Sequence, residues 1–321
     1  MVVLVFVDDL IVLVDSNQQL HWFQETASKL FTIKHLGPVS YYLGVEISRK
    51  ADGCFELCQS NKVKALLARY GMEEASSVQT PMATGYGKEP EGEVFQNVQL
   101  YQSLIGSLLH LACWSRPDIS YAVHILCQKN AEPHHKDWVA AKRVLRYLSG
   151  TIERKLSLNV GEKPELRTYA DASWGDRPKA KSTTGIGIFL GDALLLWKAT
   201  KQTLVACSTC EAEYGAINEF VLNIEWAIQL MKDLNIPINL PVTVYSDNSA
   251  AKELTENQAA RGRSKHILIR YQNVREAVTR NLIKITKCTS EKNAADIFTK
   301  CLNVNEHVKV VQYLGLLCTV D

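Results

Sequence analysis

The C-terminal half of the chain predicts an α/β fold in which helices pack on a mixed sheet of five strands. Strands and helices are expected in the order strand, strand, strand, helix, strand, helix, strand, helix. A second observation is that acidic residues recur on or beside these elements, where burial without a partner is costly. The expected strands are short, β-branched segments at 166–169, 185–191, 194–199, 242–248 and 282–286.

Composition and charge are those of an ordinary globular protein. Of the 321 residues, 46% are hydrophobic and 22% are charged, and the net charge is +2. Any affinity for nucleic acid must therefore come from local basic patches. The nine cysteines are scattered, which suits a reducing compartment. Asp8 and Asp9 interrupt the apolar N-terminus, which also lacks signal-peptide features. We expect no membrane partner and an intracellular location, and nothing indicates the oligomeric state.

The first 83 residues predict two hairpins and two helices. Apolar runs at 1–7 and 10–14 flank Asp8 and Asp9, which would lie at the tip of the first hairpin. Aspartate is common in turns, so this pair has an ordinary structural explanation as well. The remaining elements are a helix at 18–31, a hairpin that turns at 52–53, and a helix at 62–70.

A linker and a helical segment follow. Residues 84–97 contain frequent glycine and few apolar side chains, which indicates a linker. Residues 98–155 show apolar side chains at helical spacing. Lys142, Arg143 and Arg146 form a basic cluster there, which suits either a phosphate backbone or a solvated helix face.

Four carboxylates in the C-terminal half fall at a mid-strand position, a strand end and two helix starts. Glu213 is preferred to Glu211 because Glu211 lies three residues after Ser208 and completes a capping-box pattern. Each acid has an ordinary explanation by itself, such as a turn or a helix dipole. The four candidates are Asp171, Glu213, Asp247 and Asp296.

The strongest electrostatic feature is the stretch 261–287. It holds eight Lys or Arg residues, opposed only by Glu276. Such a stretch suits a nucleic-acid backbone.

These motifs resemble those of copia-type retrotransposon Pol polyproteins. The run Phe6-Val7-Asp8-Asp9-Leu10 is similar to the aromatic-x-Asp-Asp motif of reverse transcriptases. The four acids resemble the metal-binding set of ribonuclease H: Asp171 in Tyr-Ala-Asp-Ala-Ser, Glu213 in Glu-Ala-Glu-Tyr, Asp247 in Tyr-Ser-Asp-Asn-Ser and Asp296 in Ala-Asp-Ile-Phe-Thr-Lys. The chain departs from the family at Gln272, where His is usual, and at Cys301, where Pro is usual.

The resemblance implies a domain order for the chain. A ribonuclease H-like mixed five-stranded sheet with helices would be preceded by a truncated polymerase palm and a helical connection. The expected segments are a partial palm at 1–83, a linker at 84–97, a thumb or connection at 98–155, a ribonuclease H domain at 160–303 and a C-terminal tail at 304–321.

The resemblance also implies an activity. Asp171, Glu213, Asp247 and Asp296 would bind two Mg²⁺ or Mn²⁺ ions and hydrolyse the RNA strand of an RNA–DNA hybrid. The family location is cytoplasmic, in virus-like particles, or nuclear. The residues expected to contact the hybrid are Ala172, Ser173, Ser208, Asn248, Arg263, Lys265 and His266.

Asp8 and Asp9 are expected to be a vestigial polymerase metal site. In the family a third Asp lies on an earlier strand, which this sequence does not include, so polymerisation by this chain alone is not expected. The alternative to an enzyme is a non-catalytic nucleic-acid-binding remnant of a retroelement.

Overall fold

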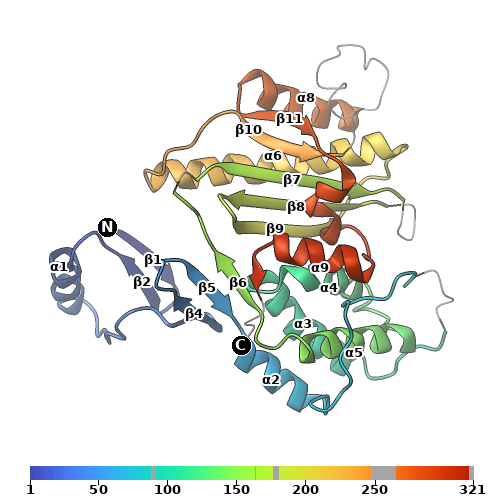
Figure 1. Cartoon of the computed structure of the whole chain (residues 1–321), viewed down its shortest axis with the longest axis horizontal. Coiled ribbons are helices and arrows are strands. Elements are labelled where there is room, and N and C mark those ends of the chain that lie inside the picture. Colours follow the sequence, from blue (N-terminus) through green and yellow to red (C-terminus); the bar gives the residue numbers. More distant parts are fainter. Residues whose placement is uncertain (88–91, 163, 176–180, 248–264, 318–321) are drawn as a thin grey trace.

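The computed structural model describes residues 1–87, 92–162, 164–175, 181–247 and 265–317, with only the backbone described for 265–271. These residues form a two-stranded sheet and two five-stranded sheets (Figure 1). The sheet that carries the candidate acids lies at the upper right of Figure 1, and the two-stranded sheet lies at the left.

The C-terminal sheet has the strand order β11-β10-β7-β8-β9. Strands β7, β8 and β9 form an antiparallel meander, whereas β10 pairs in parallel with both β7 and β11. This sheet confirms the predicted ribonuclease H-like α/β fold. Its strands are β7 (Leu166–Ser173), β8 (Thr183–Leu190), β9 (Ala193–Lys201), β10 (Val242–Ser246) and β11 (Ile283–Lys287).

Helices cover both faces of this sheet. On one face, α6 (Thr209–Asp233) and α8 (Lys265–Thr279) lie side by side, and on the other lies the 3-10 helix η4 (Ala294–Phe298) (Figure 1). The apolar side of α6 packs against β7, β8 and β10. Ser208 caps α6 by accepting a hydrogen bond from the Glu211 backbone N–H at 3.2 Å, and the Glu211 carboxylate accepts one from the Cys207 N–H at 2.8 Å. The predicted capping role of Glu211 is confirmed.

The helices near the end of the chain differ from the prediction. Asp296 lies in the five-residue η4 and does not open a longer α-helix. The Thr299 hydroxyl donates to the Asp296 carbonyl at 3.1 Å, a local bond that competes with continued helix. The basic stretch also contains helix α8, which was not predicted. Its charges obscured an apolar periodicity that includes the buried Val274 and Ala277. The helix expected at 249–255 lies outside the described residues.

The N-terminal part contains the two predicted hairpins. Strands β1 (Val2–Phe6) and β2 (Asp9–Leu13) pair with each other, and α1 (Asn17–Ser28) follows them. The second hairpin belongs to the other five-stranded sheet, of order β12-β6-β5-β4-β3. Its first three strands are β3 (Tyr41–Tyr42), β4 (Val45–Arg49) and β5 (Phe55–Cys58).

The helical segment 98–155 shares one hydrophobic core with Met82 and with the helix that precedes the linker. Tyr101, Leu108 and Leu145 are fully buried among side chains from several of its helices. The helices are α2 (Ser60–Arg69), α3 (Val98–Trp114), the 3-10 helix η1 (Pro117–Ile119), α4 (Ser120–Cys127) and α5 (His135–Ser149).

Residues 304–317, which we expected to lie in a tail, are part of the folded core. They form α9 (Val304–Tyr313) and β12 (Leu316–Leu317), and β12 pairs antiparallel with β6 (Lys155–Leu158). Leu314 is fully buried in a cluster that includes Leu156 and Phe298. In Figure 1, α9 lies between the C-terminal sheet and the helices α3 and α4. A further 3-10 helix, η3 (Ser290–Lys292), precedes η4.

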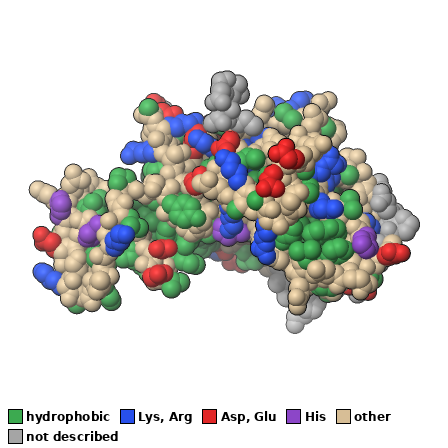
Figure 2. All heavy atoms as spheres, turned by 90° about the horizontal axis from the view of Figure 1, so that it is seen from below, with side chains coloured by type: hydrophobic (Ala, Val, Ile, Leu, Met, Phe, Trp, Pro, Cys, Tyr) green, Lys and Arg blue, Asp and Glu red, His purple; other side chains and the backbone are tan. Residues whose placement is uncertain are grey.

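The surface carries apolar side chains as well as charges. Figure 2 shows hydrophobic side chains on the lower face among basic and acidic ones. On the first hairpin, Val5, Phe6 and Val7 are exposed. Within the described residues, every helix is too short or too polar to cross a lipid bilayer.

Gly185 should be required for the packing of η4. A Cβ at this position would lie 2.7 Å from the Ala295 carbonyl oxygen and 2.9 Å from Phe298 Cβ. We expect Gly185→Ala to lower the free energy of unfolding by about 2 kcal/mol, because η4 must shift. Urea unfolding of both forms measures this.

Gly106 in α3 is the control for this experiment. A Cβ there meets nothing within 4 Å, so Gly106→Ala should stabilise the protein by about 0.5–1 kcal/mol. Equal effects of the two substitutions would contradict the close approach of η4 to β8.

Candidate metal centre

Asp171 occupies the middle of the C-terminal sheet. Strand β7 continues past Tyr169 to Ser173, and Asp171 is paired with Gly185 of β8. Only 4% of Asp171 is exposed. Because side chains alternate along a strand, Asp171 and Tyr169 lie on the same face of the sheet, where Tyr169 packs with η4.

Asp247 is brought beside Asp171 by the register of two parallel strands. Tyr245 of β10 is opposite Tyr169 of β7, and their rings stack at 5.2 Å. Each aspartate follows its tyrosine by two residues, so the two carboxylates occupy equivalent positions on neighbouring strands. The Ser290 hydroxyl donates to Asp247 Oδ2 at 2.8 Å and orients this carboxylate.

Glu213 joins these two aspartates from α6. One carboxylate oxygen from each of Asp171, Glu213 and Asp247 lies within 4.8 Å of the other two. Glu213 is buried, as predicted from its place beside the apolar stripe of the helix, whereas Glu211 caps the helix. The structure therefore brings three of the four candidate acids into one group.

Asp296 lies next to this group, on η4. The negative charge of Asp171 raises the pKa of Asp296, which reflects how close the two carboxyl groups lie. Asp296 is 8% exposed, and its Oδ2 is 2.7 Å from Lys300 Nζ. Because Gly185 leaves no side chain between β8 and η4, the helix approaches closely enough to place Asp296 beside β7.

Ser290, described above, and three further polar residues at the site were not among the candidates. The Thr299 hydroxyl donates to Asp171 Oδ2, Lys300 pairs with Asp296, and Asn293 donates to the Ala170 carbonyl at 3.4 Å. Thr299 and Lys300 follow Asp296 by three and four residues. In a helix, residues at this spacing lie on the same face as Asp296, so the sequence could have indicated both. Nothing in the sequence pattern indicated Asn293 or Ser290.

The pKa values reflect crowded, buried negative charge. Burial, together with the negative charges of Asp171 and Asp247, raises the pKa of Glu213 to about 9. Burial and the charge of Asp171 raise the pKa of Asp296 to about 7, although Lys300 opposes this. Burial also raises the pKa of Asp171, against the effect of Lys300 and Thr299. Asp171, Glu213 and Asp296 therefore ionise together only with difficulty.

The donor set fits divalent metal ions. Among the described residues, Glu213 Oε2 and Asp296 Oδ1 are buried and have no hydrogen-bond partner. An unpaired carboxylate oxygen away from water is costly, and hard divalent cations bind such oxygens. A cation between these carboxylates would satisfy the unpaired oxygens and lower the pKa values.

The expected nucleic-acid contacts are only partly described. Ala172 and Ser173 continue β7 beyond Asp171 and are half-buried, and Ser208 is half-buried at the start of α6. Lys265 and His266 begin α8, but their side chains lie outside the description, and Asn248 and Arg263 lie outside the described residues altogether.

Asp8 and Asp9 lie far from this centre. Asp8 is in the turn of the first hairpin and Asp9 begins β2, and both are exposed. Figure 1 shows this hairpin at the opposite side of the molecule from β7 and β10. The two acid sites are therefore independent of each other.

Comparison with known proteins identifies the family. Residues 1–84 match the reverse transcriptase (RNA-dependent DNA polymerase) family. The chain is 34% identical over 306 residues to the retrovirus-related Pol polyprotein from transposon RE2 of Arabidopsis thaliana, covering 94% of this chain and 21% of that protein. It is 32% identical over 225 residues to the putative transposon Ty5-1 protein of Saccharomyces cerevisiae, covering 68% of this chain and 72% of that protein. The chain belongs to the copia-type retrotransposon Pol family. It spans about a fifth of the RE2 polyprotein.

Two solved structures are similar to this Pol chain. One is the N-terminal RNase H domain of a Mycobacterium tuberculosis protein, with a TM-score of 0.32 and 14% identity, covering 46% of this chain and 97% of that one. The other is a foamy viral protease-reverse transcriptase in complex with an RNA/DNA hybrid, with a TM-score of 0.49 and 12% identity, covering 90% of this chain and 36% of that one.

Stability without metal should fall as the pH rises. A carboxyl with a raised pKa in the folded state stabilises the protein below its unfolded pKa, and this stabilisation is lost as the pH rises through the folded pKa. For Glu213 that window runs from about 4.5 to about 9. In EDTA, the wild-type protein should lose unfolding free energy between pH 5 and pH 9. We expect this loss to be smaller by at least ~2 kcal/mol in Glu213→Gln, because Gln does not ionise.

Glu211→Gln, two residues away, is the control for this pH dependence. The Gln side chain can still accept the hydrogen bond from the Cys207 N–H, so this substitution should change stability little and equally at both pH values. Urea unfolding at the two pH values measures all three proteins. Parallel losses for wild type and Glu213→Gln would contradict the burial of an ionisable Glu213.

Proposed function

We propose that this Pol chain is a metal-dependent ribonuclease that hydrolyses the RNA strand of RNA–DNA hybrids. The observation that carries the proposal is the convergence of Asp171, Glu213 and Asp247 within 4.8 Å, with Asp296 beside them. Membership of a retrotransposon Pol family supports a nucleic-acid substrate. Oxygen-only donors suit Mg²⁺ or Mn²⁺ better than metals that prefer nitrogen or sulfur.

Each acid has a defined task in this proposal. Asp171 lies between the other ligands and is held by β7 and by the Thr299 hydroxyl. Glu213 and Asp247 complete the group from α6 and from the end of β10. When bound, two divalent ions would activate a water molecule and stabilise the leaving oxygen. Asp296 and Lys300 adjust the charge at the edge of the site, since Lys300 neutralises Asp296 when no other cation does.

Selection of the RNA strand requires contacts to 2′-hydroxyl groups. Ser173 lies two residues beyond Asp171 on the same strand, and Ser208 lies at the N-terminus of the helix that carries Glu213. The backbone of Ala172 lies between the acid and Ser173. These polar groups lie close in the sequence to the acids, on the elements that carry them. Residues that contact the hybrid during cleavage must lie near the metal ligands. The basic stretch 261–287 supplies charge for the phosphate backbone.

Cleavage of a labelled RNA–DNA hybrid by the full chain tests the proposal. We expect RNA cleavage with Mg²⁺ that stops in EDTA, and a decrease of at least ~100-fold in rate for Asp171→Asn, which keeps the shape but loses a charged ligand. Asp8→Asn is the matched control and should cleave at the wild-type rate. A folded wild-type chain that binds the hybrid without cleaving it would favour the non-catalytic remnant instead.

We infer that this chain alone does not extend a primer. Asp8 and Asp9 are exposed at a hairpin tip, and among the described residues they belong to no group of three possible metal ligands. A polymerase site needs a third carboxylate to hold two ions. A primer-extension assay with Mg²⁺ and nucleoside triphosphates should therefore show no product, while the same sample cleaves the hybrid. DNA synthesis that is lost in Asp8→Asn would overturn this inference.

A further inference from the structure

A buried group of charged and polar side chains lies away from the metal centre, in the helical segment. Arg116 and Asp118 are 1% and 2% exposed and form a bidentate ion pair, with distances of 3.0 and 2.8 Å. Arg154 is 3.1 Å from the same carboxylate. The Tyr147 hydroxyl donates to Asp118 Oδ2 at 2.7 Å. Burial would raise the pKa of Asp118, but the two guanidinium groups hold it well below its usual range.

This group contacts the C-terminal part of the chain through His307. His307 Nε2, on α9, is 2.9 Å from the Tyr147 hydroxyl, and the two rings pack edge to face. Both residues are buried, and burial lowers the pKa of His307 to about 4, so its imidazole is neutral at physiological pH. A hydrogen bond between two buried groups is costly to break, because each group loses a partner that bulk water does not replace.

A short stretch of chain connects His307 to the metal centre. Thr299 lies eight residues before His307 and donates a hydrogen bond to Asp171. Asp296 and Lys300, which form an ion pair, lie close to Thr299 in the sequence. Ile297 and Leu302 of this segment are buried in the same cluster as Val311 and Leu314 at the end of α9. Helix α9 and η4 are therefore packed together as one unit.

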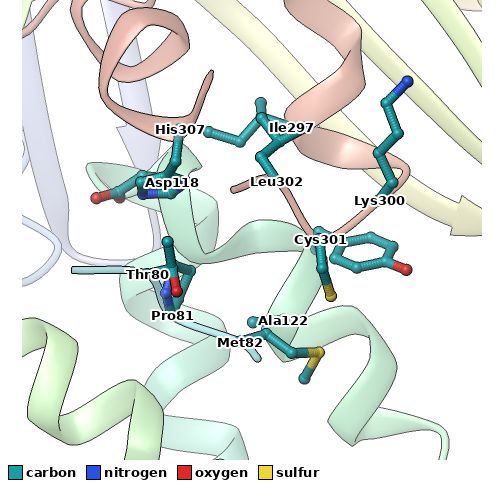
Figure 3. Close-up of a pocket in the computed structure, with 11 residues that line it drawn as sticks. Thr80, Pro81, Met82, Asp118, Ala122, Ile297, Lys300, Cys301, Leu302 and His307 are labelled. Atoms are coloured by element: carbon teal, nitrogen blue, oxygen red, sulfur yellow. The ribbon is translucent and has the colours of Figure 1, made fainter. Parts of the chain in front are cut away.

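This unit meets the helical segment along a tight contact. Figure 3 shows Ile297, Leu302 and His307 on one side and Thr80, Met82 and Ala122 on the other, with Lys300 pointing away toward the sheet. The cavity between them is about 20 Å³, about the size of one water molecule. Close packing of this kind transmits a displacement from one wall to the other.

We propose that Tyr147 and His307 are positioning residues for the metal centre: their hydrogen bond fixes α9 on the helical segment, and α9 in turn holds Thr299 and Asp296 in place against β7. This inference rests on the proposed function of the same site. It assigns part of the metal affinity to a contact outside the nuclease sheet. Loss of the bond would leave His307 Nε2 unpaired in the interior, and α9 would move to relieve it.

The test compares two buried tyrosines in the full chain. Tyr147→Phe removes the bond to α9 together with the bonds that the Tyr147 hydroxyl makes with Asp118 and Arg154, and the His307 variants below isolate the bond to α9. Tyr101→Phe removes a buried bond within the helical segment alone, from Tyr101 to the Leu126 carbonyl at 2.9 Å. Mn²⁺ binding is measured by electron paramagnetic resonance of the free ion, and cleavage of the hybrid is measured against Mg²⁺ concentration.

We expect Tyr147→Phe to weaken Mn²⁺ binding about 10-fold and to raise the Mg²⁺ concentration for half-maximal cleavage by a similar factor, as loss of groups that orient metal ligands does. The rate at saturating Mg²⁺ should change little. Tyr101→Phe should lower the melting temperature by a comparable amount and leave both metal measurements unchanged.

Substitutions at the other end of the bond keep the test decisive if Tyr147→Phe does not fold. Gln places a polar atom near the position of His Nε2, so His307→Gln should bind Mn²⁺ almost as well as wild type. His307→Leu should bind as weakly as Tyr147→Phe, and the double variant should be no weaker than either single one.

The outcomes separate this inference from the proposed function. Wild type that binds no Mn²⁺ and cleaves no hybrid contradicts the proposed function itself. Wild type that binds and cleaves, with Tyr147→Phe and His307→Leu equal to Tyr101→Phe in metal affinity, overturns only the positioning role.

Discussion

The structure depends on the electrostatic cost of gathering four carboxyl groups where water is scarce. Asp171, Glu213, Asp247 and Asp296 come from two neighbouring strands and from helices on both faces of one sheet. No pair of them is adjacent in sequence, so the whole sheet must form before the charges meet. Their mutual repulsion opposes folding in the absence of a cation, and the surrounding core must supply the free energy that overcomes it.

Several features around the acids reduce that cost. Thr299 and Ser290 each donate a hydrogen bond to a carboxylate, and Lys300 pairs with Asp296. Gly185 contributes by having no side chain, since any Cβ would push η4 away from β7. These residues bind no substrate in the proposed reaction. They keep the acids at a spacing that a metal ion can use, which is a requirement on geometry as much as on charge.

Much of this was predictable because it depends on local pattern. The β-branched runs predicted the strands, and the spacing of Ser208, Glu211 and the apolar stripe separated a capping glutamate from a buried one. The placing of Asp171 beside Asp247 required only strand order and register, and Glu213 joins them from α6. The 3-10 geometry of η4 was not predictable, since it depends on the Thr299 hydroxyl and on packing against Gly185. The pairing of β12 with β6 was also not predictable, because a strand of two apolar residues is too short to show a periodic pattern.

The pairing of β12 with β6 has a consequence for how the chain is made. The sheet that starts with β3, β4 and β5 is completed by Leu316 and Leu317, some 260 residues later. During synthesis the early strands and β6 must wait, with one edge open, until the end of α9 has left the ribosome. An open edge invites pairing with other chains. Premature termination after the last acid would therefore leave every proposed ligand present but the protein prone to aggregate, so intact metal-binding motifs alone do not identify a working copy.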